Sequence, residues 1–600
     1  MCGIAGVFKL DDNKATKEEI KTLTDLLIHR GPDGEGVYCE GSVGLGHRRL
    51  SIIDLTDDGK QPMLFDEKYV ITFNGEIYNY LEVKKELIKK GYNFKSKTDT
   101  EVILAAYDYY GEECLKHFNG MWAFVIYDKV KNILFCSRDR FGVKPFYYSV
   151  NNNQFIFSSE IKPILSTFSS VKVDKGILME YLIMNMTDHT ERTFFEGIKT
   201  LRGSHNLIIN LRTKEMSIKP YYSIKHSPEI AKLNEEDSID LFEKEFKRSI
   251  EWRLRSDVKV GTCLSGGLDS SYIAAVASKM YKHNDDVKFN AITAESLDPA
   301  LNETAYAKIV VDHLNLDWHV TSPTAKDFNE GVQDLVRTQE EPFGTPSVFL
   351  QNLVMKKAKE SGVTVLLDGQ GADETILGYP RYIGAYLKTL PFYKRPFVLK
   401  SMSTNYGLPL IELIKNQFYF TSYQIKKKRV LMRLGKVNQD FMDALDFSTL
   451  KDLSKAYGNL SMLQQMEVMK TQIPQLLKWE DKNSMAYSVE TRLPFLDYKL
   501  VETNLSINNS FKLNNLWSKY VLRKAMEKVL PASIVYRKKK IGFTAPAKDW
   551  LHNSAIWDVV VKSPMLNEIF NNNIKKPNDI NLFWRVCNIA LWEKEFEVKY

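Results

Sequence analysis

Alternating hydrophobic and polar positions dominate the first two hundred residues and predict short strands. The segment CGIAGVFKL is one of these, and the later ones are KYVITFNGEIYN, WAFVIYD, NILFCSRD, PFYYSV and QFIFSSE. Hydrophobic residues at helical spacing interrupt the strands at about 17–28, 80–90 and 99–117. Strands and helices that do not alternate strictly predict an α+β domain built in layers.

A polar, turn-rich stretch from about 204 to 236 is predicted to be a linker. After it, the apolar segments VKVGTCL, FNAITA, DWHVTS and VTVLLDG alternate with helical segments. This order is typical of an α/β doubly wound parallel sheet with helices on both faces. From about residue 380 the chain is mainly helical and rich in aromatic and basic residues. Because a single hydrophobic core does not extend over 600 residues, we predict two domains, at 1–205 and 236–600.

The amino-acid composition limits the kinds of protein and of partner that fit this chain. Hydrophobic residues make up 44% and charged residues 26%, as in ordinary globular proteins. The net charge of +7 comes from interspersed charges, which favours a solvated surface and no nucleic-acid partner. We expect no membrane partner, because no segment reaches the ~18 apolar residues of a span and the first residues do not resemble a signal peptide.

Six widely spaced cysteines without a CxxC pair favour a reducing, cytoplasmic compartment. The sequence leaves the oligomeric state open, a homodimer included.

Cys2 is the first candidate for chemistry. Removal of the initiator methionine would make it the N-terminal residue, with nucleophile and base on one residue and an α-amino pKa of about 8. A cysteine at this position also occurs by chance. The segments HRGPDGEG, GHRRLSIIDL, NGEIYN and TDTE follow it. They supply a guanidinium for a carboxylate, carboxylates for an ammonium group and amide donors for an oxyanion, which predicts a pocket for a small amino acid.

These segments, with MCGIAGVF before them, resemble in order the motifs of the class II glutamine amidotransferases. That family has the N-terminal-nucleophile fold, a sandwich of two sheets between helix layers. The resemblance implies that Cys2 attacks the side-chain amide of glutamine. The binding roles that it implies are Arg49 for the substrate α-carboxylate, Glu76 and Asp99 for its α-amino group, and Asn74 and Gly75 for the oxyanion hole.

The segment SGGLDSS at 265–271 follows a predicted strand and opens a predicted helix. Its glycines allow backbone N–H groups to approach a phosphate at the positive end of the helix. The lysine of a Walker A loop is absent. SGGxDS resembles the pyrophosphate loop of the ATP pyrophosphatases, which cleave ATP between the α and β phosphates. Such cleavage activates a carboxylate by adenylation.

The Mg²⁺ that accompanies pyrophosphate needs oxygen ligands, and Asp269 and Asp373 are the candidates. Helix capping is an alternative role for Asp269, and the two roles are compatible.

The rest of the chain resembles the asparagine synthetase family. The ATP-binding residues that this implies are Leu264, Ser265, Gly266, Gly267, Asp269, Ser270, Ile292, Asp368, Gly369, Lys482 and Lys540, with the two lysines near the phosphates. The implied reaction converts aspartate, glutamine and ATP to asparagine, glutamate, AMP and pyrophosphate. The family also passes ammonia through an internal tunnel.

The segment DGQGADE departs from this family at Gln370, where an acidic residue is usual. The family's carboxylate is assigned to forming the acyl-adenylate and to helping ammonia attack. Glutamine cannot act as a base, although it donates and accepts hydrogen bonds, so Gln370 stays among the candidate catalytic residues. Its presence leaves open whether the acceptor is aspartate or another carboxylate, such as a sugar acid.

Three other interpretations have less support. β-Lactam synthetases form an amide within one molecule but lack the terminal cysteine. RNA-modifying enzymes share the pyrophosphate loop but have no glutaminase half, and the basic and aromatic region at 380–430 is typical of solvated helix faces. A non-catalytic binding protein would require both sites to have decayed, and the nucleophile and the loop are both intact.

Overall fold

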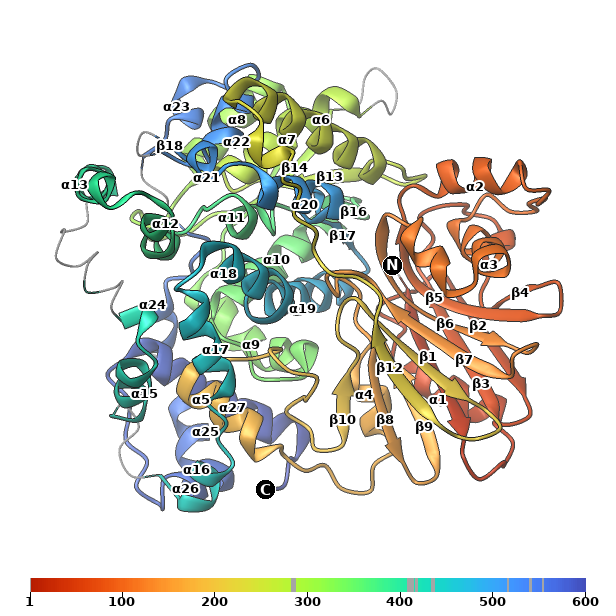
Figure 1. The fold of residues 1–600 in the computed structure, drawn as a ribbon. Helices are drawn as coiled ribbons and strands as arrows, with labels where there is room; N and C mark the ends of the chain where they lie inside the picture. Colours follow the sequence, from red (N-terminus) through yellow and green to blue (C-terminus); the bar gives the residue numbers. More distant parts are fainter. Residues whose placement is uncertain are drawn as a thin grey trace.

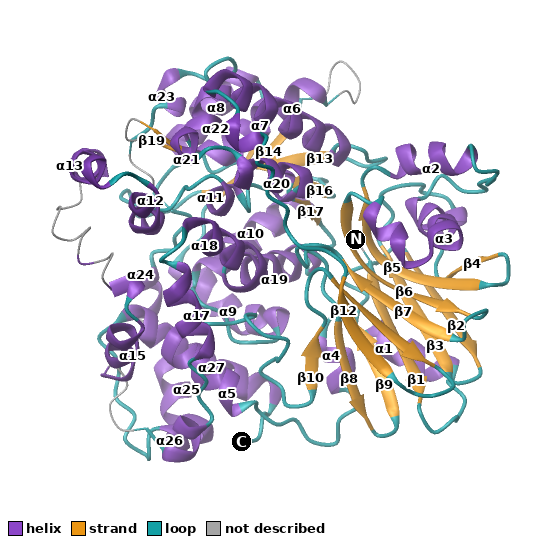
Figure 2. Cartoon of the chain, in the orientation of Figure 1, coloured by secondary structure: helices purple, strands orange, loops and turns teal. Residues whose placement is uncertain are grey.

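The computed structural model describes residues 2–281, 288–406, 415, 419–432, 437–514, 517–538, 542–552 and 555–600. Figure 1 shows a strand-rich half and a mainly helical half, and Figure 2 shows how the strands concentrate in the first of them. None of the described helices has the length and apolar character needed to cross a lipid bilayer.

Two antiparallel sheets form the strand-rich half. Within the described residues their strand orders are β10-β8-β9-β1-β3-β2 and β12-β11-β7-β6-β5-β4. The first sheet consists of β1 Gly3–Lys9, β2 Gly34–Glu40, β3 Val43–Arg49, β8 Tyr147–Asn151, β9 Gln154–Ser158 and β10 Ile198–Thr200. The second consists of β4 Met63–Phe65, β5 Tyr69–Ile77, β6 Gly120–Asp128, β7 Ile133–Arg138, β11 His205–Asn210 and β12 Met216–Pro220.

A hydrophobic core fills the space between the two sheets. Ile4 and Phe8 of β1 lie in this core. Ala5 and Val7, at the alternate positions of the same strand, belong to a cluster on the outer face that includes residues of helix α1 (Lys17–Asp25). Because both faces of β1 are buried, apolar residues follow one another in this strand without intervening polar positions.

Helices cover the outer faces of both sheets. The first sheet contacts α1 and α4 (Ile161–Leu165), and α2 (Tyr80–Ile88) and α3 (Asp99–Tyr110) cover the second (Figure 1). The hydroxyl of Thr98 caps α3 by accepting the N–H of Glu101, which satisfies one of the free donors at the helix start. The predicted sandwich of two sheets between helix layers is confirmed.

The linker predicted from about 204 to 236 is wrong over its first part. Strand β11 pairs with β7, and β12 extends the sheet beyond β11. Every residue of β12 is exposed, so the alternation of Met216 and Ile218 with polar positions marks no buried face, and the pairing of the strand depends on its neighbour. Residues 221–234, with a short turn at Ile230–Lys232, connect β12 to helix α6 (Glu235–Arg253).

A parallel sheet lies at the centre of the helical half. Among the described residues its order is β15-β14-β13-β16-β17, and each neighbouring pair is parallel. Its strands are β13 Val260–Cys263, β14 Asn290–Ala294, β15 Asp317–Thr321, β16 Val365–Leu367 and β17 Glu490–Arg492. Val365 and Leu367 face one hydrophobic cluster, and Leu366 between them faces another. The sheet is therefore covered on both sides, as predicted.

The helices around this sheet are α7 Leu268–Met280, α8 Thr304–Leu314, α9 Ala325–Gln339, α10 Ser347–Glu360, α11 Ala372–Thr375, α19 Ile473–Met485, α20 Tyr498–Ser506 and α22 Tyr520–Met526. The region after 380 is mainly helical, as predicted. Within the described residues, its other helices of at least seven residues are α12 Ile383–Thr389, α13 Arg395–Tyr406, α15 Tyr423–Met432, α17 Ser448–Ala456, α18 Leu460–Met466, α25 Ile556–Lys562 and α27 Ile580–Phe596. Helix α5 (Lys175–Met184) of the first 205 residues packs against α27.

Helix α19 ties the two halves together through buried charges. Arg30 donates from Nη1 to Asp481 of this helix at 2.9 Å and to Glu160 at 3.0 Å. Lys482, the next residue of the helix, pairs with Glu340, which also accepts two backbone N–H groups of α4 at 2.8 Å each. All five of these side chains are buried, so no water is available to replace a lost partner.

Replacing Asp481 by asparagine should destabilise the protein. The change leaves the buried Arg30 guanidinium with one carboxylate instead of two, and breaking a buried pair in this way costs about 3 kcal/mol. Calorimetry should show a lower melting temperature. Asp312→Asn, which removes a surface pair with Lys308, is the control and should melt like the wild type. Equal melting of Asp481→Asn and the wild type would contradict this role.

Candidate active sites

Three contacts position Cys2 at the start of β1. Its backbone N–H donates to Oδ1 of Asn74 at 3.1 Å, and its carbonyl accepts Nε–H of Arg30 at 3.2 Å. Its Sγ lies 4.0 Å from the carbonyl oxygen of Leu50. Burial raises the pKa of the Cys2 thiol, and the terminal ammonium is the largest of the opposing influences. The nucleophile is thus fixed in place but needs a base to ionise.

Asn74 and Gly75 lie beside Cys2 in β5. The Asn74 side chain is fully buried, and its Nδ2 has no hydrogen-bond partner within the described residues. A Cβ at Gly75 would meet the carbonyl oxygen of Met121 at 2.1 Å, so only glycine fits there. Because a buried donor without a partner costs about 1–3 kcal/mol, Nδ2 is available to an oxygen that a ligand brings, as in an oxyanion hole.

A single cavity brings together five of the six residues predicted for the glutamine pocket, namely Cys2, Arg49, Gly75, Glu76 and Asp99. The sixth, Asn74, reaches it through the contact with Cys2. Arg49, at the end of β3, donates to the carbonyl oxygen of Thr56 at 2.6 Å and to that of Asp54. These two carbonyls orient a guanidinium whose charge is available to a carboxylate.

Glu76 and Asp99 bring two buried carboxylates to the same cavity as Arg49. Asp99 begins helix α3 and accepts the N–H of Ile77 at 2.8 Å. Burial raises the pKa of Asp99 to about 7. Burial, followed by the charge of Glu490, raises the pKa of Glu76 well above its ordinary value. A ligand ammonium group would lower both pKa values, since it would add positive charge beside the two carboxylates.

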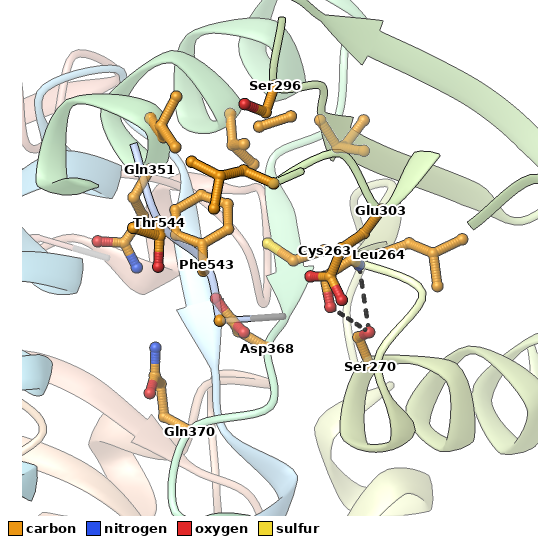
Figure 3. A pocket seen from close by; sticks show the side chains of 17 residues that line it. Cys263, Leu264, Ser270, Ser296, Glu303, Gln351, Asp368, Gln370, Phe543 and Thr544 are labelled. Atoms are coloured by element: carbon orange, nitrogen blue, oxygen red, sulfur yellow. Dashed lines mark hydrogen bonds between the residues drawn. The ribbon is translucent and has the colours of Figure 1, made fainter. Parts of the chain in front are cut away.

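A second cavity opens at the carboxyl ends of β13, β14 and β16 (Figure 3). The predicted residues that line it are Leu264, Ser265, Ser270, Ile292, Asp368 and Gln370. Figure 3 shows Phe543 and Thr544 across the cavity from Ser270 and Glu303. The carboxyl edge of a parallel sheet is where open α/β folds bind their ligands.

The SGGLDSS loop joins β13 to α7 at one side of this cavity. Gly266 has φ +74°, and a Cβ there would meet the backbone nitrogen of Ala307 at 2.5 Å, so the turn requires glycine. Ser265 Oγ accepts the N–H of Gly267 at 3.2 Å. A Cβ at Gly369 would lie 3.1 Å from the Cβ of Asp269. The two loops therefore meet directly below the start of α7, where backbone N–H groups favour an anion.

Asp269 and Asp373 lie on either side of the Lys519 ammonium group. Lys519 Nζ lies 2.6 Å from a carboxylate oxygen of each of them. The position between the two carboxylates thus holds a positive group. Such a position suits the two carboxylates as the predicted ligands of Mg²⁺. The described residues contain no group of three or more His, Cys, Asp or Glu side chains suited to a metal. A metal held here would complete its shell with phosphate oxygens and water.

Lys482, one of the two predicted lysines, is not among the residues that line this cavity. Lys482 lines a different cavity, where the two halves meet, and its ammonium group pairs with Glu340. The expected placement of Lys482 beside the loop is therefore not seen, because the buried carboxylate of Glu340 holds its charge at the interface. Lys540 lies outside the described residues.

Sequence reasoning missed the charged residues of β17. Glu490 and Arg492 are both fully buried and form an ion pair with Nε to Oε1 at 2.6 Å. Arg492 Nη2 also lies 3.4 Å from Glu76 of the first cavity. Three polar residues in a row do not suggest a buried strand, so the only sequence signal was two opposite charges two positions apart.

Comparisons with known proteins agree with this architecture. Residues 1–222 match the family model described as glutamine amidotransferase domain, and residues 241–562 match the one described as asparagine synthase. The chain is 33% identical to glutamine-hydrolyzing asparagine synthetase 1 of Bacillus subtilis, over 92% of this chain and 88% of that protein. It is 31% identical to asparagine synthetase 3 of the same organism, over 90% and 86% of the two chains.

A relative with a different name is the amidase chry2 of Gibberella zeae, 28% identical over 93% of this chain and 89% of that protein. The match to the asparagine synthase model covers more than half of the 600 residues. Both predicted parts are therefore confirmed as an amidotransferase part and a synthase part of one enzyme. The chain belongs to the asparagine synthase family and is a glutamine-hydrolysing ligase that forms C–N bonds.

Proposed function

We propose that this enzyme makes asparagine from aspartate, with glutamine as the nitrogen donor and ATP as the activating substrate. The observation that carries the proposal is the presence in one chain of two built cavities, one at Cys2 and one at the SGGLDSS loop. The names of the Bacillus subtilis relatives support aspartate as the acceptor. The alternative acceptor, another carboxylate, rests on Gln370 alone.

In the first cavity, Cys2 would attack the glutamine side-chain amide. Arg49 would bind the α-carboxylate, Glu76 and Asp99 the α-ammonium group, and the Asn74 Nδ2 and Gly75 N–H the oxyanion. Removal of Met1 would turn the Cys2 nitrogen, now 3.1 Å from Asn74 Oδ1, into an amine that takes up the thiol proton.

In the second cavity, the adenosine of ATP would contact Leu264, Ile292, Asp368 and Gly369, and its phosphates the N–H groups of Ser265, Gly266 and Gly267 with the Ser270 hydroxyl. Asp269 and Asp373 would hold Mg²⁺ after Lys519 shifts toward the phosphates. Bound there, Mg²⁺ supplies charge neutralisation for the pyrophosphate leaving group. Gln370 would contact the acceptor, and the adenylated carboxylate would then receive ammonia.

Replacing Asn74 by alanine should lower glutamate release from glutamine by about 100- to 1,000-fold, because it removes the oxyanion donor. Pyrophosphate release with ammonium chloride in place of glutamine should stay at the wild-type level, which controls for folding. Assays of the two products on the same preparation test this. An Asn74→Ala enzyme with wild-type glutaminase activity would exclude this residue from the oxyanion hole.

The KM for glutamine should fall as the pH rises from about 6 to about 8. The pKa of Asp99 is raised to about 7, so this carboxyl is protonated below that pH and ionised above it. Only the ionised form attracts the substrate ammonium group. Steady-state kinetics separate this effect on KM from thiol ionisation, which acts on kcat. Asp99→Asn should have a high KM that no longer changes over this range. If its KM fell with pH as steeply as that of the wild type, the assignment would be refuted.

With glutamine and Mg-ATP, aspartate should cause pyrophosphate release and asparagine formation in equal amounts. A panel of sugar acids and other amino acids provides the comparison. Glutaminase activity without a response to aspartate would overturn aspartate as the acceptor. Asp269→Asn and Asp373→Asn should abolish pyrophosphate release while glutamate release without ATP continues.

A further inference from the structure

Helix α19 carries a buried carboxylate that has no assigned role in either of the two sites. Glu480 is 1% exposed, and within the described residues neither of its carboxylate oxygens has a hydrogen-bond partner of good geometry. Removing a carboxylate from water without a matched partner costs several kcal/mol. Such a group persists in a fold when its chemistry is needed.

Glu480 lies beside the second cavity. Asp368 and Gln370, which line that cavity, both approach its carboxylate, as does Thr491 of β17. The cation that faces it is Lys144, from the loop between β7 and β8. Cys263, at the end of β13, also lies within reach of its charge. Glu480 therefore lies next to Asp368 and Gln370 of the cavity lining.

The contact with Gln370 explains the departure from the family pattern. The family pattern that this chain resembles usually has an acidic residue at the position of Gln370, whereas here position 370 is an amide and a carboxylate comes from α19. Acidic residues at both positions, next to Asp368, would place three carboxylates together, and like charges at such distances repel strongly. A glutamine at 370 removes that repulsion and has an N–H donor to offer Glu480.

We infer that Glu480 is the acid–base residue of the amidation step and replaces, from α19, the carboxylate that the family carries at position 370. The inference rests on the proposed adenylation of a carboxylate. Ammonia attacks the acyl carbon, the C–N bond forms, and the bond from that carbon to the AMP oxygen breaks. The proton that the nitrogen loses passes to Glu480, and AMP leaves with the bonding electron pair.

The position of Glu480 suits this step in two ways. Its neighbour in the helix, Asp481, holds Arg30, which contacts the Cys2 carbonyl, so the helix that carries Glu480 is also linked to the residue that would release ammonia. Burial, followed by the charge of Asp368, raises the pKa of Glu480 well above 4.5. A carboxylate with a raised pKa is a stronger base than an exposed one and better matched to neutral pH.

The test exchanges the two side chains. The variants are Glu480→Gln, Gln370→Glu, and the double variant with both changes, which moves the carboxylate to the family position. Amide and pyrophosphate are measured with ammonium chloride, Mg-ATP and the carboxylate that the wild type accepts. Glu593→Gln is the matched control, because Glu593 is a buried carboxylate of α27 whose partners are Ser563 and Met565.

Glu480→Gln should lose about 100-fold or more in amide formation while glutaminase activity is unchanged. It should still release pyrophosphate in the first turnover, so that pyrophosphate exceeds amide. The double variant should recover much of the lost rate, and Glu593→Gln should behave like the wild type. Wild-type amide formation by Glu480→Gln, or a double variant no better than the single one, would overturn the inference.

A melting experiment tests Glu480 without any substrate. When folding raises the pKa of a carboxyl, the folded protein loses stability as the pH rises above the ordinary pKa of that carboxyl. Glu480→Gln should therefore melt at a higher temperature than the wild type at about pH 8 and similarly in acid. Lower melting at both pH values would show a structural role instead. If the wild-type enzyme formed no product from aspartate, the proposed acceptor would be wrong. The melting comparison would still test Glu480, because it uses no substrate.

Discussion

The ion pair between Arg30 and Asp481 is the contact on which both sites depend. It joins the strand-rich half to helix α19, and both side chains are buried. Arg30 also holds the carbonyl of Cys2, and Asp481 follows Glu480 in the helix. One interaction thus links the nucleophile of the first cavity to the helix whose Glu480 lies next to the second. Because neither charge has water as an alternative partner, the pair resists separation, and the two sites keep a fixed relation.

The first site is marked by polar groups that the fold leaves incompletely satisfied. In the first cavity these are the Asn74 amide nitrogen and the carboxylates of Glu76 and Asp99. They complement the ammonium group of glutamine and the oxyanion that would form during the reaction. In the second cavity, Lys519 balances Asp269 and Asp373. The free energy lost in burying these groups becomes available to the ligand that satisfies them.

The sequence predicted the sandwich, the parallel sheet and the members of the first cavity well, because each rests on local signals. Glycine is required at positions 75 and 266, where the fold leaves no room for a Cβ, and the apolar segments of the parallel sheet, such as that of β16, mark buried strands. Prediction failed where pairing across the fold supplied the stability. Strand β12 has only exposed residues, and β17 consists of polar residues whose charges are neutralised by one another and by Glu76.

By itself, the sequence determined which chemical groups are available. These are a thiol at position two, a guanidinium, paired carboxylates and a phosphate loop, each within a short segment that folds locally. Only the tertiary structure decided which charges meet. It took Lys482 away from the loop and paired it with Glu340, and it brought Glu480 beside Gln370, more than a hundred positions away in the chain. Partners of buried charges are chosen by proximity in a low-dielectric interior, and spacing along a sequence does not encode that proximity.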